Sequence, residues 1–185
     1  MSKAEIPIRD FPYLLHPYNA TLVTCIGKDG KPNIIAIAWI IPVSINPPYL
    51  VMSIRPTRYS YKLIMETGEF VVNIPPHKLA SEVIFCGRKS GRNYDKFKET
   101  GLTPMKARKV TPPIIAECIA HIECKVAKAI ETGDHILIIG EVLTAYASKE
   151  YFEKHYKLEK YNPLLHIRGN LFTTTVNKIE EIKLK

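Results

Sequence analysis

Short stretches of apolar residues separated by turn residues run along most of the chain, a pattern typical of β-strands. The first two stretches are Asn19 to Gly27 and Pro32 to Ile41, and Lys28-Asp29-Gly30-Lys31 lies between them. Asp-Gly at this place indicates a tight hairpin turn, because glycine accepts the positive φ that such turns require. The two strands are therefore expected to pair. The second strand is apolar on both faces, as expected of a strand inside a barrel or a covered sheet.

The same reading predicts the remaining elements. Further strands are expected at Tyr49 to Ile54, Phe70 to Ile74 and Leu171 to Val176, and within two long β-rich stretches, Ile114 to Ile130 and His135 to Tyr146, which flank a hairpin turn at Glu131 to Asp134. Helices are expected at Thr57 to Glu66, with Thr57 as N-cap and Gly68 as stop signal, at Leu79 to Cys86 and at Ser148 to Tyr156. Many strands with few short helices predict a mainly β fold, a β-barrel with helical additions.

Length and composition narrow the class of protein. A chain of 185 residues suits one domain, so residues 1–185 are expected to form a single domain. Apolar residues make up 46% and charged residues 24%, and no apolar run approaches the about 20 residues of a membrane span. Charged residues within Met1 to Asp10 leave no room for the apolar part of a signal peptide. We expect a soluble, cytoplasmic protein with no membrane partner.

Several common chemistries have no support in the sequence. Four cysteines, Cys25, Cys86, Cys118 and Cys124, show no C-x-x-C spacing, so buried free thiols are favoured over metal ligands. The histidines show no H-E-x-x-H spacing, and no metal is expected. The sequence also lacks a Rossmann glycine motif, a P-loop and a G-x-S-x-G elbow. Any nucleotide must therefore bind in another way.

The net charge of +8 allows nucleic acid, a membrane surface or an anionic small molecule as partner. The lysine-rich run Lys178 to Lys185 is explained equally well by a polar face or a frayed terminus. A basic nucleic-acid-binding barrel of the OB type should place exposed aromatic residues among its basic ones. The strands here are largely aliphatic, so no nucleic-acid partner is expected.

Two basic stretches are candidates for anion binding. Ser53 to Ser60 contains Arg55, Thr57, Arg58 and Ser60 at the end of a strand, where a helix begins and its free N–H groups point outward. This stretch could hold a phosphate, or Thr57 could cap the helix while the arginines are solvated. The glycine-flanked loop Gly87 to Arg92 adds Lys89, Ser90 and Arg92, which could approach the same anion.

Three further residues are ambiguous. Trp39, the only tryptophan, could lie against a flat aromatic ring or fill the core. Asn33, just after the first hairpin, is either a turn residue or a hydrogen-bond donor to a ligand. His135 follows Gly133-Asp134 and could reach a ligand at the barrel rim or be a satisfied turn residue.

At these residues the sequence resembles the flavin reductase-like family, which includes flavoredoxins, archaeal ferric reductases and reductase components of two-component monooxygenases. The resemblance runs from about Pro17 to Tyr146. It is carried by Thr24-Cys25, Asp29 to Asn33, Trp39, Pro42-Val43-Ser44, Pro47-Pro48, Arg58-Tyr59-Ser60, Gly68 to Pro75, Gly133-Asp134-His135 and Ile139 to Val142. The order and spacing of these pieces make the resemblance specific.

The resemblance implies a homodimeric split β-barrel of Greek-key type that holds FMN non-covalently near the subunit interface. Asn33, Trp39 and backbone groups of the following residues, including Ile40 and Pro42, would face the isoalloxazine ring. Thr57, Arg58, Ser60, Lys89 and Ser90 would serve the phosphate end, and Arg55 would also belong to the cofactor site. His135 would lie where a nicotinamide docks, and Phe172 would close the site.

Members of this family differ in reaction, so fold and cofactor carry over better than activity. The resemblance favours an NADH- or NADPH-dependent reductase that passes electrons through FMN to free flavin, ferric iron or another acceptor. The alternative is a flavoredoxin-like carrier that exchanges electrons with a redox protein and has no nicotinamide site of its own.

Overall fold

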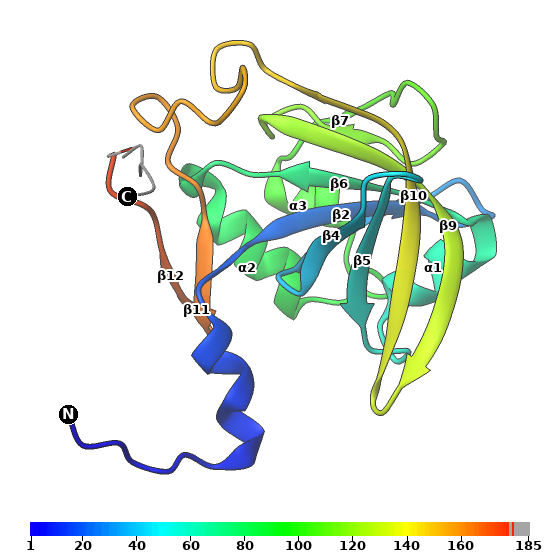
Figure 1. The fold of residues 1–185 in the computed structure, drawn as a ribbon. Helices are drawn as coiled ribbons and strands as arrows, with labels where there is room; N and C mark the ends of the chain where they lie inside the picture. Colours follow the sequence, from blue (N-terminus) through cyan, green and yellow to red (C-terminus); the bar gives the residue numbers. More distant parts are fainter. Residues whose placement is uncertain (178, 180–185) are drawn as a thin grey trace.

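The predicted hairpin is present and starts the main sheet of the molecule (Figure 1). Strands β2 (Thr21–Ile26) and β3 (Pro32–Ile37) pair antiparallel, and Gly30 takes a φ of 77° in the turn between them. The computed structural model describes residues 1–177 and 179. The lysine-rich run at 178–185 therefore lies, apart from residue 179, outside the described residues.

Seven antiparallel strands form one curled sheet in the order β3-β2-β6-β9-β10-β5-β4. The other five strands are β4 (Ile40–Ser44), β5 (Tyr49–Ile54), β6 (Glu69–Ile74), β9 (Ala120–Thr132) and β10 (His135–Ala147). The strand predicted at Tyr49 to Ile54 and the hairpin turn before His135 are both confirmed. β5 and β6 follow each other in the sequence and are joined through α1 (Tyr59–Thr67), but β10 and β9 lie between them in the sheet. A connection of this kind is typical of Greek-key barrels.

The two edges of the sheet meet at Trp39, where the prediction of one strand from Pro32 to Ile41 is wrong. The chain leaves β3 at Ile37 and enters β4 at Ile40, which lies at the opposite edge of the sheet. Between them the carbonyl of Trp39 accepts a hydrogen bond of 2.9 Å from the backbone N–H of Ser53. The apolar residues continue through the turn that closes the barrel, so the sequence pattern does not indicate this turn.

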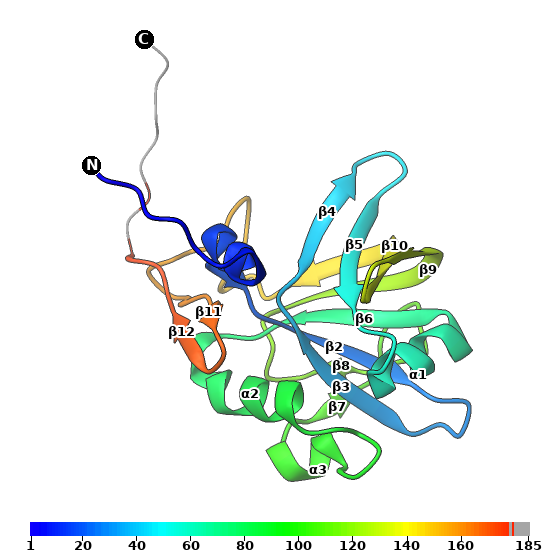
Figure 2. The ribbon, with the colours of Figure 1, turned by 90° about the horizontal axis from the view of Figure 1, so that it is seen from below.

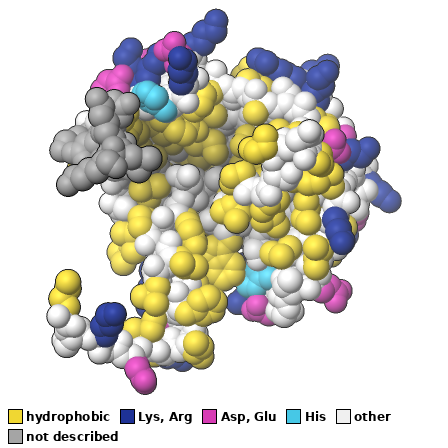
Figure 3. Space-filling model, in the orientation of Figure 1, with side chains coloured by type: hydrophobic (Ala, Val, Ile, Leu, Met, Phe, Trp, Pro, Cys, Tyr) yellow, Lys and Arg dark blue, Asp and Glu magenta, His cyan; other side chains and the backbone are white. Residues whose placement is uncertain are grey.

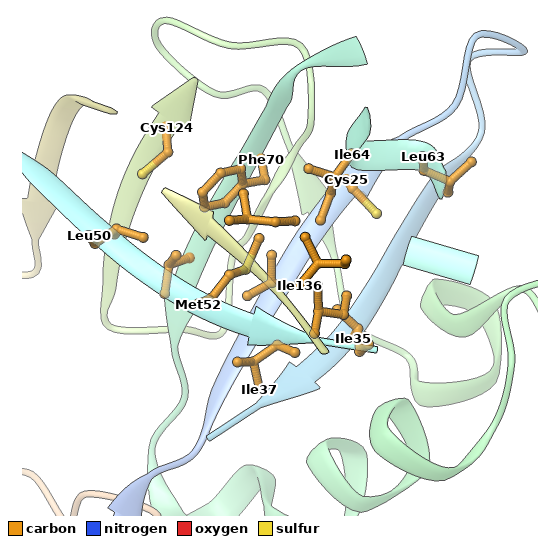
Figure 4. Packing of buried hydrophobic residues seen from close by; sticks show 14 residues of the cluster. Cys25, Ile35, Ile37, Leu50, Met52, Leu63, Ile64, Phe70, Cys124 and Ile136 are labelled. Carbon is orange, nitrogen blue, oxygen red and sulfur yellow. The ribbon is translucent and has the colours of Figure 1, made fainter. Parts of the chain in front are cut away.

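The barrel is filled by aliphatic side chains from the inward faces of its strands and from α1 (Figure 4). Phe70 and Met52 are fully buried at its centre. Gly140 on β10 lets β10 and Phe70 come together, since a Cβ at this glycine would lie 2.5 Å from the Phe70 ring. A β-bulge separates Ile139 from Gly140 in the pairing with β9. Burial of this cluster is the main source of stability of the barrel.

A second cluster of buried residues lies outside the barrel, between β2 and β3 on one side and two short helices on the other. These helices are α2 (Ala80–Arg88), preceded by the 3-10 turn η2 (His77–Leu79), and α3 (Lys96–Thr100). The helix predicted from Leu79 to Cys86 is thus confirmed within a residue or two. All four cysteines are buried and free, as predicted.

A small three-stranded sheet joins the two ends of the described chain (Figure 2). Its strands are β1 (Tyr18–Asn19), β11 (Leu165–Arg168) and β12 (Leu171–Thr173), in the order β1-β11-β12. The 3-10 helix η1 (Ile8–Leu15) precedes β1 and lies beside this sheet. The stretch predicted as one strand from Asn19 to Gly27 is therefore divided at Ala20, whose N–H donates to Leu164.

Two local predictions are wrong. Thr57 is not the N-cap of α1: the helix begins at Tyr59, and Arg58 occupies the cap position without a side-chain cap, whereas Gly68 ends the helix in the left-handed conformation as predicted. Ser148 to Tyr156 is not a helix but a run of turns, with an isolated bridge between Phe152 and Tyr156.

The remaining strands, β7 (Pro104–Met105) and β8 (Ile114–Ile115), form a two-stranded sheet. Within the described part of the chain, no helix is both long and apolar enough to cross a membrane.

Candidate functional site

The two basic loops singled out in the sequence converge on one small pocket of about 150 Å³. One side is the loop from β5 into α1 and the other is the loop that follows α2. The lining consists of Thr57, Arg58, Tyr59, Ser60, Arg88, Lys89, Ser90, Gly91, Arg92 and Lys96 over Ile35, Cys86 and Gly87. Five of these side chains are basic and none is acidic.

Side-chain contacts hold the two loops in place around this small pocket. Asn33 on β3 donates from Nδ2 to the Ser60 hydroxyl over 2.7 Å. Arg92 donates to the Thr57 carbonyl over 3.4 Å and stacks over the Tyr59 ring at 5.2 Å. Gly91 passes so close to Asn33 that a Cβ would lie 2.1 Å from the Asn33 Oδ1. The position of the second loop thus requires glycine.

The start of α1 adds hydrogen-bond donors to this positive charge. Arg58 at the N-cap makes no side-chain cap, and the Tyr61 N–H donates to the Arg58 carbonyl over 3.1 Å, so the N–H groups of Tyr59 and Ser60 are the ones left for a ligand. Ser60 accepts a hydrogen bond from Asn33, and a hydroxyl that accepts one bond can also donate its proton to another acceptor. Helix N–H groups, hydroxyls and cations around a small hollow are the groups that bind a phosphate dianion.

The small pocket opens into a large cavity of about 660 Å³, since Ile35, Arg58, Gly87 and Arg88 line both. β3, the closing turn at Trp39 and the end of β5 form one wall of the large cavity, and α2 forms another. Figure 3 shows that many of the side chains on this face of the molecule are hydrophobic. A phosphate group in the small pocket would therefore place the rest of its molecule in the large cavity.

Trp39 and His135 lie together at the barrel side of the large cavity, with ring centroids 5.2 Å apart. His135 donates from Nδ1 to Asp134 Oδ1 over 2.6 Å, and Asp134 in turn pairs with Arg55 at 3.0 Å. The hydrogen bond from His135 and the Arg55 charge lower the pKa of the Asp134 carboxyl. Because Nδ1 is held by this carboxylate, Nε2 is the nitrogen of His135 left for a ligand.

The third wall of the large cavity comes from η1 and the β11–β12 hairpin. Arg9, Tyr13, His16, His166 and Phe172 contribute to it. The two segments are tied together by an ion pair of 3.0 Å between Arg168 and Asp10 and by a hydrogen bond of 2.9 Å from His16 Nδ1 to the His166 carbonyl. Burial lowers the pKa of His166, which favours the neutral form of this imidazole.

Most of the candidate residues lie at the site. Trp39, Arg55, Arg58, His135 and Phe172 line the large cavity, and Thr57, Arg58, Ser60, Lys89 and Ser90 line the small pocket. Three do not line either space: Asn33 is buried under Ser60, Pro42 is exposed on β4, and Ile40 lines a separate apolar groove.

Sequence reasoning missed Arg9, His16, Arg88, Lys96, His166 and Asn170. Arg88 belongs to the basic loop Gly87 to Arg92, so its place in that loop could have identified it as a candidate residue. The others lie in segments that reach the site only through tertiary contacts, and nothing in their local pattern marks them.

Taken together, the structure is a curled antiparallel barrel with a pocket at its mouth that is lined by hydroxyl and basic side chains. Residues 13–175 match the model of the family described as flavin reductase like domain, and the chain belongs to this family. The match extends beyond residues 17–146, over which the resemblance was strongest, and includes β11 and β12.

Individual relatives agree with this assignment. A protein of Archaeoglobus fulgidus is 42% identical over 129 residues, which are 70% of this chain and 72% of the relative. A flavin reductase (NADH) of Kitasatospora aureofaciens is 34% identical over 127 residues, 69% of this chain and 64% of the relative. The crystal structure of a flavoredoxin from Methanosarcina acetivorans has a TM-score of 0.85 at 28% identity and covers 98% of this chain and 95% of that chain.

Proposed function

We propose that this chain is an oxidoreductase that binds FMN and passes electrons from NADH or NADPH to free flavin, ferric iron or another acceptor. The observation that carries the proposal is the junction of the two spaces: a phosphate-sized pocket of helix N–H groups, hydroxyls and cations that opens into a cavity flanked by Trp39. Membership of the flavin reductase family supports the same function.

The donor set fits one phosphate monoester. Thr57 and Ser60 supply hydroxyls, and Arg58 and Lys89 supply positive charge. Among the described residues, no acidic side chain lines the small pocket. The large cavity offers Trp39 and Phe172 as flat neighbours for an aromatic ring. Bound FMN would supply the ring that accepts and releases electrons, while the protein binds, orients and shields it.

His135 is proposed to orient the electron donor. Asp134 fixes the imidazole so that Nε2 is turned away from the carboxylate, and Trp39 packs beside the ring. A neutral Nε2 accepts a hydrogen bond, and such a group can hold the carboxamide of a nicotinamide. His135→Ala is therefore expected to impair reduction by the nicotinamide donor more than it impairs FMN retention.

Anaerobic mixing of the purified protein with NADH or NADPH tests this function. We expect an oxidised-flavin absorbance spectrum before mixing and bleaching of the visible band afterwards. His135→Ala should retain the flavin and slow the bleaching with either donor. Purified protein that contains no flavin and binds no added FMN would refute the proposal.

A second candidate is a flavoredoxin-like carrier, which the likeness to solved flavoredoxins supports. Such a carrier would keep its flavin oxidised in the presence of both nicotinamides but would be reduced by dithionite. Its electrons would then pass to a redox protein. The same anaerobic experiment, with dithionite as a further arm, separates the two candidates.

We also propose that the protein is a homodimer and acts in the cytoplasm. An apolar groove of about 280 Å³ lies beside the large cavity, and Phe11, Leu15, Trp39 and Ile41 line it with exposed side chains. A second copy seated there would cover this surface and complete the wall at Trp39. The buried free thiols support a reducing compartment.

A further inference from the structure

Lys96, at the start of α3, is buried although it carries a charged ammonium group. Lys96 is only 4% exposed. Its Nζ donates to the carbonyl of Ile34 over 2.6 Å and to the carbonyl of Cys86 over 2.7 Å. No carboxylate of the described residues forms an ion pair with it. A buried cation without an opposite charge is costly to keep.

The surroundings of Lys96 add to this cost. Burial lowers the pKa of the Lys96 ammonium, and the nearby Arg58 guanidinium lowers it further. Lys96 also belongs to the lining of the small pocket, whose other charged side chains are all arginine or lysine. An anion in this pocket would balance several like charges at once.

We propose that Lys96 is the buried counter-charge of the ligand phosphate and sets the preference of the site for a phosphorylated flavin over the unphosphorylated one. This inference rests on the proposed flavin-binding function. The two carbonyls take two of the three ammonium protons, so the third is left for an acceptor in the pocket.

A purely structural role predicts something different. If Lys96 only joined the carbonyls of Ile34 and Cys86, its removal would destabilise the protein and weaken every flavin alike. If it neutralises the phosphate, its removal acts only on ligands that carry one. In both cases the carbonyls of Ile34 and Cys86 lose their donor, so the contrast between phosphorylated and unphosphorylated ligands separates the two roles, and the stability of the ligand-free protein does not.

Binding of FMN and riboflavin to the flavin-free protein, followed by quenching of flavin fluorescence, distinguishes these roles. For Lys96→Met we expect the Kd for FMN to rise by about 10- to 100-fold, with the Kd for riboflavin within about 3-fold of wild type. The rise in Tm on addition of FMN should largely disappear. Lys98→Met, an exposed lysine of the same helix, is the matched control and should leave both affinities unchanged.

Equal losses for FMN and riboflavin, or an unchanged FMN affinity, would overturn the assignment. Lys96→Gln retains a donor for one carbonyl and should show the same selective loss. If neither variant folds, Lys96 is a structural residue and the proposal is wrong. Wild-type protein that binds neither flavin would instead contradict the proposed function itself.

Discussion

At the scale of single residues, the two loops of the small pocket are positioned by close contacts with Asn33. Asn33 joins β3 to the Ser60 hydroxyl, while its Oδ1 is buried under Gly91 without a hydrogen-bond partner among the described residues. The chain at Gly91 can approach this amide only because glycine has no Cβ. Lys89 was predictable from its glycine-flanked basic loop, whereas Lys96 was not, because Asp95-Lys96-Phe97 has the pattern of any short solvated helix start.

Gly91→Ala tests this close approach. The added methyl group would overlap the Asn33 amide and displace the second loop, so FMN affinity should fall by about 10-fold or more. Asn33→Ala removes the group that the methyl would meet. The double variant should therefore lose less than the sum of the two single losses, as a double-mutant cycle of FMN titrations can measure. Strictly additive losses would argue against the contact.

Lys89→Ala tests the charge on the rim of the small pocket. Removal of one charge-assisted contact should weaken FMN binding by about 1–3 kcal/mol, with a smaller effect at high salt. Fluorescence titration at two ionic strengths measures both. Lys31→Ala, in the exposed turn of the first hairpin, is the control and should bind as wild type.

At the scale of elements, local pattern predicted strands and turns well but not the ends that tertiary contacts decide. β5 and the left-handed Gly68 depend on nearby residues, and both were predicted correctly. The break at Trp39 depends on a hydrogen bond to Ser53 across the closing barrel, which no local pattern contains. A helix was predicted at Ser148 to Tyr156, but the structure has turns there. The rings of Phe152 and Tyr156 pack against each other in this segment, with their centroids 5.0 Å apart.

A buried carboxylate on the barrel helps to hold the segment before β8. Glu123 on β9 is fully buried and accepts hydrogen bonds from the backbone N–H groups of Arg108 at 2.8 Å and Lys109 at 2.6 Å and from the Tyr146 hydroxyl at 2.7 Å. Burial alone would raise the pKa of Glu123, but these hydrogen bonds outweigh it and hold the pKa below its usual value.

Glu123→Gln should therefore lower the free energy of unfolding by about 1–3 kcal/mol at neutral pH. A lowered carboxyl pKa stabilises the folded state above the unfolded pKa of about 4.3, and this stability is lost as pH falls through the folded value. The variant should accordingly lose less stability on acidification than wild type. Urea unfolding over a series from pH 7 down to about pH 2.5, which passes below the unfolded pKa, measures the difference, and parallel losses in both proteins would contradict this role.

At the scale of the whole molecule, the ligand cavity joins segments that are far apart in sequence. η1, β3, the end of β5, α2 and the β11–β12 hairpin all contribute to it. Sequence reasoning identified the barrel and both basic loops, because each has a local signal. Of the wall that contains His16 and His166, only Phe172 was predicted, since the wall depends on tertiary contacts such as the pairing of β1 with β11.

The proposed homodimer makes a prediction at this scale. Ile41 is 55% exposed beside the apolar groove, and a charge there would be buried by a second copy. Ile41→Glu should shift the protein from dimer to monomer in light scattering after size exclusion, with loss of FMN retention. Lys128→Glu, an exposed change on β9 opposite Ile139, is the control. A wild-type protein that is monomeric at all concentrations would contradict the proposal.

The pairing of β1 with β11 and the bond between Asp10 and Arg168 also affect how the protein can be handled. Because the beginning and the end of the described chain share one wall of the cavity, a disturbance of either end reaches the ligand. A bulky affinity tag or fusion partner at one terminus should weaken cofactor retention much as one at the other would. Tag-free material is therefore the proper reference for every binding measurement on this protein.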